Sequence, residues 1–317
     1  MLSQRILAIV LNWNGGRAVE DCVEALRSSR AVSLDVLVVD NASTDGSAER
    51  LGGRSGLQLI RNTSNLGYAA GNNVGLRWAH DREYTFAAVV NQDCRVEPEC
   101  LAELNSFLAQ NPTAGAAGPQ ILMEGSQLVE SEGIAVCFNH VTAAMLNAGR
   151  LPSPGQSARR VDAVPGSALF LRVGAVAEVG YFDSRFFLYL EEVDLCYRLS
   201  LAGYGVYYLP TARAVHLGAA GQDPQRRRLK LYYLRRNSVL FVRKHGRWFH
   251  KLQFGLLSIL SLVYGAVTVL WKGSAGWDML RAKLRGYRDG WLAGPLEPAR
   301  YADEARPGGP GAPPRIR

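Results

Sequence analysis

The sequence lacks any arrangement of cysteines that would hold a zinc ion or build a disulfide framework. Its five cysteines are an odd number, and no two of them form a Cys-x-x-Cys pair. We therefore expect reduced thiols in a cytoplasmic protein, mostly as small residues of the core. The N-terminus enters a strand-like run almost at once, and it shows no signal peptide.

The chain also lacks the composition of a disordered protein and the signature of a nucleic-acid-binding fold. Hydrophobic residues make up 48% of its 317 residues and charged residues 20%, which is ordinary for a globular protein with a sizeable core. The net charge of +8 would suit nucleic acid, an anionic membrane or a pyrophosphate-bearing substrate. Much of this excess lies after residue 225, and we expect no nucleic acid partner.

Short apolar runs alternate with segments of helical spacing along the first part of the chain. Strands are predicted at 6–11, 34–39, 57–60 and 86–90, and helices at 18–28, 69–80 and 98–110, the last with Pro98 in its first turn. This alternation predicts an α/β fold whose mostly parallel sheet is covered by helices on both faces. A second region should complete the pocket, with strands at 167–172, 206–209 and 212–215 and helices at 174–179 and 191–202.

Acidic residues occur in three distant segments of the sequence, and we expect them to contribute to one site. Asp40 and Asp93 each follow a predicted buried strand, and Glu191, Glu192 and Asp194 open a predicted helix. Ligands of open α/β sheets bind outside the carboxyl ends of the strands, so we expect Asp40 and Asp93 to meet in one crevice. One acid that binds a base or ribose, one that holds a metal and one that takes a proton are the groups a sugar-nucleotide transferase needs.

Blocks of sequence around these acids resemble family 2 glycosyltransferases of the GT-A fold. The blocks are IVLNWN (9–14), VDNASTDGS (39–47), NLGYAAGNN (65–73), NQD (91–93), PGSA (165–168), YLEEVDLCYR (189–198), His216, and RRN (235–237) through KH (244–245). They occur in the family's order and cover roughly residues 5 to 245. Within the family the chain is most similar to bacterial rhamnosyltransferase-like enzymes of surface polysaccharide assembly.

The resemblance implies a role for particular residues. The implied binding residues for a nucleotide-diphosphate sugar donor are Asn12, Asn14, Asp40, Asn65, Gly67, Asn72 and Asn91. The implied ligands of a Mn²⁺ or Mg²⁺ ion are Asp93 and His216, although Asn91 replaces the first acid of the family's metal motif. The family's general base aligns best with Glu192, and Glu191 and Asp194 are the other candidates.

Each of these residues also has a purely structural interpretation. Asp40 would cap the turn that follows it, and Asp93 would cap the next helix. Asp194 would pair with Arg198, which lies four residues further on the same helix. His216 would be an ordinary packed or surface histidine, and the acidic helix start would act only on the helix dipole.

The C-terminal part differs in character from the rest. Residues 252–271 are 20 residues without a charge, which as a helix would be long enough to cross a bilayer. They are expected to be a single span, a re-entrant hairpin or an interfacial helix, with a buried core helix as the alternative. The basic and aromatic stretch 226–251 suits a membrane surface, or else a solvated helix face. Proline and glycine dominate the tail, which should be disordered.

These expectations combine into one domain plan and one activity. We expect a GT-A domain at 1–222, a helical membrane-associated extension at 223–293 and a disordered tail at 294–317. The activity would be that of a metal-dependent, inverting hexosyltransferase that moves a sugar, with rhamnose from a dTDP donor as the leading candidate. Its acceptor would be lipid-linked or a polysaccharide, at the cytoplasmic face of the cell membrane, reached peripherally or through a single span. The alternative is a non-catalytic nucleotide-sugar-binding or scaffold protein that retains the fold.

Overall fold

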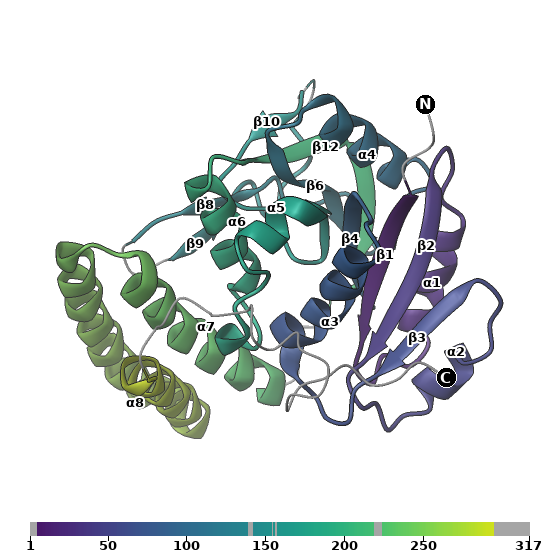
Figure 1. The fold of residues 1–317 in the computed structure, drawn as a ribbon. Coiled ribbons are helices and arrows are strands. Elements are labelled where there is room, and N and C mark those ends of the chain that lie inside the picture. The colour runs from purple at the N-terminus through teal and green to yellow at the C-terminus, as the bar shows by residue number, and fades with distance from the viewer. Residues whose placement is uncertain (1–4, 139–141, 154, 156, 219–223, 295–317) are drawn as a thin grey trace.

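The computed structural model describes residues 5–138, 142–153, 155, 157–218 and 224–294, and the expected disordered tail lies almost wholly outside them. A twisted sheet forms the centre, with helices on both of its faces (Figure 1). Its strands are β1 (Arg5–Asn12), β2 (Ser33–Asp40), β3 (Leu57–Arg61), β4 (Phe86–Asn91), β5 (Cys94–Val96), β6 (Ala114–Met123), β7 (Val129–Ser131), β10 (Arg159–Arg160), β11 (Ala168–Arg172) and β12 (Gly205–His216). Strands β8 (Ile134–Val136) and β9 (Ala143–Met145) form a separate small sheet.

The helices follow the predicted alternation with the strands in the first part of the chain. They are α1 (Ala18–Arg27), α2 (Ser47–Leu51), α3 (Gly67–Asp81), α4 (Cys100–Gln110), α5 (Val173–Glu178), α6 (Glu191–Leu201), α7 (Pro224–His245) and α8 (Trp248–Leu292). Pro98 lies in the turn before α4 and not in its first turn, so that prediction was wrong. Its carbonyl oxygen accepts a hydrogen bond from the Arg30 backbone N–H at 2.8 Å, which holds the turn against the end of α1.

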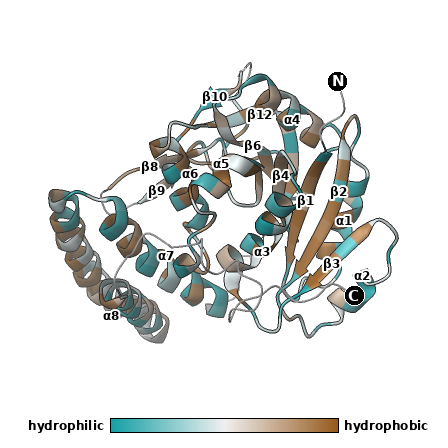
Figure 2. Ribbon diagram, viewed as in Figure 1, coloured by the Kyte–Doolittle hydropathy of each residue, from teal (hydrophilic) through white to brown (hydrophobic). Residues whose placement is uncertain are grey.

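The order of strands along the main sheet is β10-β12-β6-β11-β4-β1-β2-β3. Strands β1, β2, β3 and β4 pair in parallel, and β1 and β2 are among the most hydrophobic parts of the ribbon (Figure 2). The central strands β1, β2 and β4 are covered on both faces, which explains their continuous apolar runs in the sequence, whereas β3 (LQLIR) lies at the edge of the sheet and is partly exposed. Asn12 pairs with Asp40, and Leu11 with Asn91, so the carboxyl ends of β1, β2 and β4 lie level.

Strand β11 runs antiparallel between β4 and β6 and joins the two halves of the sheet. The sheet is therefore mixed, with the parallel pairing of β6 and β12 beyond the antiparallel strand. Two separate strands were predicted where the structure has the single strand β12. Its register shifts between Leu209 and Arg213, because Pro210 has no N–H for the ladder.

Helix α8 is two antiparallel limbs that turn back at Gly273, whose φ of 55° is left-handed. The rings of Phe254 and Tyr287 lie 6.3 Å apart across the limbs. The second limb also packs on α7, since a Cβ at Gly290 would lie 2.7 Å from the Cβ of Val239. The three helical segments form one layer beside the sheet domain (Figure 1).

Helix α3 lies very close to β1, and two glycines make this possible. A Cβ at Gly75 would lie 2.5 Å from Ile9 Cγ2, and one at Gly71 would lie 2.5 Å from Leu11 Cδ1. This contact presses the start of α3 against the sheet edge where Asn12 and Asp40 lie.

We expect Gly75→Ala to lower the free energy of unfolding by about 1–3 kcal/mol, because the methyl group overpacks the contact with Ile9. Gly174→Ala is the matched control, since Gly174 is exposed and a Cβ there meets nothing within 4 Å. Denaturant unfolding of the two variants makes the comparison. Equal stabilities of the two variants would contradict the close packing of α3.

Candidate active site

The carboxyl ends of β1 and β2 meet through a buried hydrogen bond. Asn12 is fully buried, and its Nδ2 donates to Asp40 Oδ1 at 2.8 Å and to Ser47 Oγ at 2.9 Å. Asp40 Oδ2 accepts from the Ser43 backbone N–H at 3.2 Å, so the expected turn cap is present. Asn12 Oδ1 is buried and has no hydrogen-bond partner within the described ranges.

The two loops beside this pair are held by asparagine side chains. Asn14 has a φ of 50°, and its Oδ1 accepts from the Thr44 backbone N–H at 2.8 Å. Asn65 Oδ1 accepts from the Gly67 backbone N–H at 2.8 Å. Gly67 has a φ of 79°, and a Cβ there would lie 2.4 Å from the ring of Phe187.

Asn72 and Asn91 complete the set of predicted donor-binding residues. The fully buried Asn72 donates from Nδ2 to the Tyr68 carbonyl at 3.0 Å, and its Oδ1 is a second buried oxygen without a described partner. Asn91 ends β4, and its backbone N–H donates to the Ser167 carbonyl at 3.0 Å. Asn12, Asp40 and Asn91 thus end parallel strands, Asn14 and Asn65 lie in loops, and Gly67 and Asn72 lie in the first turns of α3.

Asp93 and His216, the predicted metal ligands, lie side by side. Asp93 is in the turn between β4 and β5, and His216 ends β12, which pairs with β5. The His216 Nε2 lies 3.1 Å from Asp93 Oδ1, and its Nδ1 lies 3.2 Å from Glu130 Oε1. The other Glu130 oxygen accepts from Ser167 Oγ at 2.9 Å.

Glu130 is a site residue that sequence reasoning missed. It lies on the three-residue strand β7, in a region without a regular pattern, and no spacing in the sequence relates it to His216. Burial alone would lower the pKa of His216, but its hydrogen bonds to Asp93 and Glu130 prevail and raise that pKa to about 10. The same bonds overcome burial and lower the pKa values of both carboxyl groups.

Two adjacent carboxyl groups open α6. Glu191 is 4% exposed and Glu192 is half-buried, and each has one buried oxygen that accepts no hydrogen bond from the described part of the chain. Burial raises the pKa of Glu192 to about 7, against the opposing effect of backbone N–H groups at the helix start. Burial and the neighbouring Glu192 raise the pKa of Glu191 well above its ordinary value. Both groups also interact electrostatically with Tyr68, as Asp93 does, so these acids share one neighbourhood.

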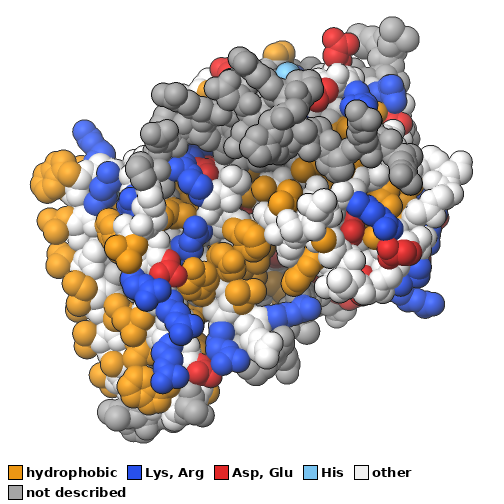
Figure 3. Space-filling model, turned by 60° about the horizontal axis from the view of Figure 1, so that its bottom comes forward, with side chains coloured by type: hydrophobic (Ala, Val, Ile, Leu, Met, Phe, Trp, Pro, Cys, Tyr) orange, Lys and Arg blue, Asp and Glu red, His pale blue; other side chains and the backbone are white. Residues whose placement is uncertain are grey.

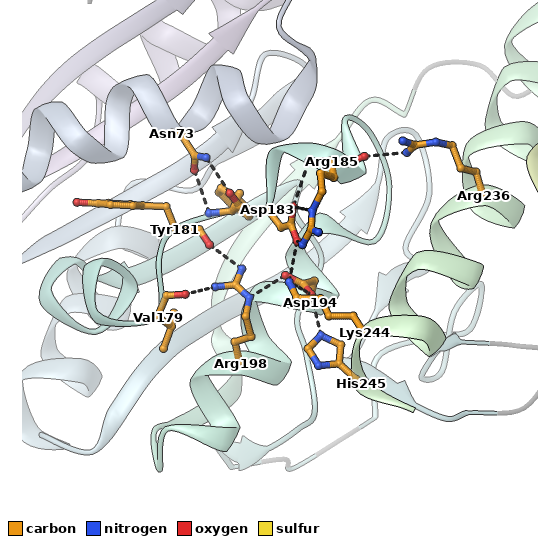
Figure 4. A network of polar contacts seen from close by, with 11 residues as sticks. Asn73, Val179, Tyr181, Asp183, Arg185, Asp194, Arg198, Arg236, Lys244 and His245 are labelled. Carbon is orange, nitrogen blue, oxygen red and sulfur yellow. Dashed lines mark hydrogen bonds and ion pairs between the residues drawn. The ribbon is translucent and has the colours of Figure 1, made fainter. Parts of the chain in front are cut away.

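Asp194, the third acidic candidate, is engaged by three basic side chains. Its fully buried carboxylate lies 2.8 Å from Arg198 Nε, 2.7 Å from Lys244 Nζ and 2.8 Å from His245 Nε2 (Figure 4). Burial would raise the pKa of Asp194, but Arg198, the hydrogen bond with His245 and Lys244 hold it well below its ordinary value. The expected pair with Arg198 is present, and Lys244 and His245 add a link from α6 to α7.

The chain matches two family descriptions. Residues 8–140 match glycosyl transferase family 2, and residues 88–288, more than half of the chain, match glycosyl transferase family group 2. The chain is 28% identical over 280 residues to the N-acetylglucosaminyl-diphospho-decaprenol L-rhamnosyltransferase of Mycobacterium tuberculosis, covering 80% of this chain and 90% of that one. It is 25% identical to the low-salt glycan biosynthesis hexosyltransferase Agl10 of Haloferax volcanii, over 83% of this chain and 84% of that one.

Solved structures share the fold. GalNAc-T7, solved with UDP, GalNAc and Mn²⁺, has a TM-score of 0.60 and 14% identity, over 77% of this chain and 48% of that one. The mannosyltransferase PcManGT of Pyrobaculum calidifontis, solved with GDP-Man and Mn²⁺, has a TM-score of 0.57 and 16% identity, over 92% and 88%. These neighbours confirm the predicted GT-A architecture. With the family matches that span most of its length, they place the chain among the family 2 glycosyltransferases.

Proposed function

We propose that this glycosyltransferase inverts the anomeric centre of its donor and that Glu192 takes the proton of the acceptor hydroxyl. The observation that carries the proposal is the state of Glu192. It is half-buried and reachable from solvent, it has a carboxylate oxygen without a partner in the described chain, and its pKa is about 7. A group that titrates near the working pH is well matched to general-base catalysis.

The reaction that follows is a single displacement. The acceptor oxygen attacks the anomeric carbon while the bond from that carbon to the diphosphate oxygen breaks. The hydroxyl proton passes to Glu192, and the nucleoside diphosphate leaves. Burial and the neighbouring Glu192 raise the pKa of Glu191 well above its ordinary value, so Glu191 holds a proton more readily than an ordinary glutamate. Asp194 is engaged by the cations Arg198 and Lys244 and by the imidazole of His245, which favours Glu192 over it as the base.

The nucleotide is proposed to lie along the carboxyl edge of β1, β2 and β4. The proposed contacts are Asn12, Asn14, Asp40, Asn65, Gly67, Asn72 and Asn91. The buried, unpartnered oxygens of Asn12 and Asn72 support this assignment, because buried polar atoms without a partner are rare in native proteins. They are acceptors, which suits the N–H groups of a base or the hydroxyls of a ribose.

A divalent ion is proposed at Asp93 and the Nε2 of His216, with Glu130 holding the other ring nitrogen and so orienting the imidazole. The described residues contain no group of three acidic, cysteine or histidine side chains already spaced to hold an ion. One carboxylate, one imidazole and the oxygens of the donor diphosphate would nevertheless suffice for Mn²⁺, and carboxylate and phosphate oxygens also suit Mg²⁺. When bound, the ion would offset the charge of the leaving diphosphate. His216 would have to release the proton that its two carboxylate partners now retain.

Rhamnose from dTDP-rhamnose is the proposed sugar, and a lipid-linked or polysaccharide acceptor is the proposed second substrate. The name of the mycobacterial relative, which the chain covers almost fully, supports both. The retained Glu192, Asp93 and His216 favour catalysis over a non-catalytic scaffold. A screen of nucleotide sugars with Mn²⁺, which reads released nucleoside diphosphate, tests the donor.

We propose that the first limb of α8 lies in the interface of the cytoplasmic membrane leaflet. Residues Trp248–Val269 are long and apolar enough to cross a membrane, with a mean hydropathy of 1.8, and 22% of that window is buried. The core helix of a soluble protein would have most of these side chains buried, whereas few of them are buried here. Its exposed side chains follow helical spacing along one face: Trp248, Leu252, Leu256, Ile259, Leu260, Val263, Tyr264 and Val267.

The second limb of α8 favours an interfacial position over a span. It packs back along the first limb and along α7, so it would have to enter the bilayer core if the first limb crossed it. A groove of about 770 Å³ between this limb and α7 is lined by Arg228, Arg281, Arg285 and Arg288. Arg228 pairs with Asp278 at 2.8 Å, whereas Arg281 and Arg285 have no carboxylate partner in the described part. Basic and hydrophobic side chains gather along this flank of the molecule (Figure 3), as at a headgroup surface.

We expect Glu192→Gln to lower kcat by about a hundredfold to ten-thousandfold, because glutamine cannot take the proton. Donor binding should survive, since the size and shape of the side chain are kept. In the unchanged enzyme, kcat/KM should fall as pH drops below about 7, because the base must be deprotonated, and this limb should vanish in Glu192→Gln. Normal turnover in Glu192→Gln would exclude this base.

Removal of the metal site should reduce turnover and its response to Mn²⁺. Asp93→Ala and Glu130→Gln should each raise the Mn²⁺ concentration needed for half-maximal activity by about 10–100-fold, the range seen when groups supporting a metal are lost. Arg95→Gln is the control, because Arg95 lies on β5 beside Asp93 and pairs with Glu124 on the surface. Full activity of the unchanged enzyme in excess chelator would contradict the metal proposal.

Vesicle flotation of the full chain tests the membrane assignment. Leu256→Glu with Ile259→Glu should weaken binding to neutral and to anionic phospholipid vesicles, because both changes charge the apolar face. Arg281→Gln with Arg285→Gln should weaken binding to anionic vesicles only, and high salt should mimic this loss. Arg17→Gln with Arg27→Gln, two exposed positions on and before α1, is the charge-matched control. A full chain that floats with neither vesicle would refute the assignment.

A further inference from the structure

The loop that leads into α6 adopts a backbone conformation that its residues disfavour. Phe187, Tyr189 and Leu190 have φ values of 60°, 69° and 68°, in the left-handed region that side chains with a Cβ rarely enter. Leu190 is also the N-cap of α6, directly before Glu191 and Glu192. The direction in which both carboxyl groups leave the helix therefore depends on a loop that its own sequence does not stabilise.

One side chain from α7 holds this loop. Asn237 is fully buried, and its Nδ2 donates to the carbonyl oxygens of Phe186 and Leu188 at 2.8 Å and of Tyr189 at 2.7 Å. Three carbonyl oxygens surround Nδ2. Exchanging Nδ2 and Oδ1 of Asn237 would therefore place the amide oxygen against these carbonyl oxygens, which is unfavourable. Three carbonyl groups of the strained loop are thus held by one amide.

The opposite end of the same amide is fixed as well. Arg236 Nη1 donates to Asn237 Oδ1 and to the Arg185 carbonyl, both at 2.8 Å. Two further contacts hold the loop at Phe187. The Tyr68 backbone N–H donates to the Phe187 carbonyl at 2.6 Å, and the Phe187 ring stacks on Tyr233 at 5.4 Å. Asn237 hydrogen-bonds to the carbonyl oxygens of Leu188 and Tyr189, directly before the N-cap Leu190.

We propose that Asn237 is a positioning residue for the transfer reaction: it holds the left-handed loop that aims Glu192 at the acceptor. It acts through the loop backbone and touches no reactant. The inference rests on the proposed role of Glu192 and deepens it, since it makes the position of the base depend on how α7 docks. Lys244 supports this view, because the same helix also contacts Asp183 at 2.8 Å before the loop and Asp194 at 2.7 Å after it (Figure 4).

The test separates positioning from plain stability. Asn237→Ala should lower kcat by about ten- to a hundredfold, because small misplacements of a reacting group cost rates of this size. The KM for the nucleotide sugar chosen by the donor screen should stay within about twofold, since the nucleotide contacts lie on other elements. The dissociation constant for dTDP, measured by calorimetry with Mn²⁺, should also be unchanged.

Two variants of the loop, Tyr189→Gly and Tyr189→Ala, provide the matched control, and Asn237→Ala is added to each. Glycine adopts left-handed φ freely, so in Tyr189→Gly the loop needs Asn237 less, and Asn237→Ala should cost at least threefold less in kcat there. Tyr189→Ala removes the same side chain without that freedom, so in this background Asn237→Ala should keep its full effect. Equal losses in both backgrounds would overturn the proposal, as would an unchanged kcat in a folded Asn237→Ala variant.

Two further variants keep the result decisive. If Asn237→Ala does not fold, Arg236→Gln is the substitute, because it removes the guanidinium that fixes Asn237. It should also lower kcat at constant KM, but by a smaller factor. A change in KM alone would again overturn the proposal. Glu192→Gln is measured beside them. If it retains activity, the base assignment fails, whereas a normal kcat in Asn237→Ala beside an inactive Glu192→Gln refutes the positioning role alone.

Discussion

The buried carboxylate of Asp194 constrains how the two parts of this enzyme fit together. An uncompensated charge in such a place costs on the order of 3–5 kcal/mol, so its partners must be present in good geometry. One of them, Arg198, comes from the same helix, but Lys244 and His245 come from the last turn of α7. The helical extension expected from residue 223 is therefore more than an attachment. The contacts of Lys244 and His245 with Asp194 join α7 to α6 across the expected domain boundary, so α7 packs as part of the catalytic domain.

Several of the proposed site residues bury polar atoms that the described protein leaves unsatisfied. These atoms are oxygens of Asn12, Asn72, Glu191 and Glu192. Burying an acceptor without a hydrogen-bond donor does not stabilise the fold, whereas a bound substrate with N–H or O–H groups would supply the missing donors. The two glutamates also divide their roles by environment. Burial and the neighbouring Glu192 raise the pKa of Glu191 well above its ordinary value, whereas burial raises the pKa of Glu192 to about 7.

The sequence was informative where chemistry follows directly from a regular element. Asp40 and Asp93 were placed correctly because each follows an apolar run that can only be a buried strand. Strand β6 was not predicted, because its small residues Ala114 to Gly118 show neither alternation nor bulk. Its burial is decided by neighbours that are distant in sequence, β11 and β12.

Glu130 and Asn237 show the same limit within the site. The role of each depends on a partner 48 or more residues away in the sequence, namely His216 for Glu130 and the loop before α6 for Asn237. Glu130 lies on a strand of three residues, and Asn237 lies on a helix whose pattern suggests only a basic surface. Propensity and periodicity describe a residue's own element, so they cannot supply contacts of this kind.

The turn at Gly273 has a consequence for the topology of the C-terminal part. The chain leaves the catalytic domain after α7, passes along both limbs of α8 and returns, so that Arg243 Nη1 donates to the carbonyl oxygen of Ala293 at 2.9 Å. The excursion is a closed loop whose entrance and exit are neighbours. A segment of this kind can be exchanged as a unit, because the two ends that must be rejoined already meet. Replacing this segment with another whose ends match would therefore leave the path of the remaining chain unchanged.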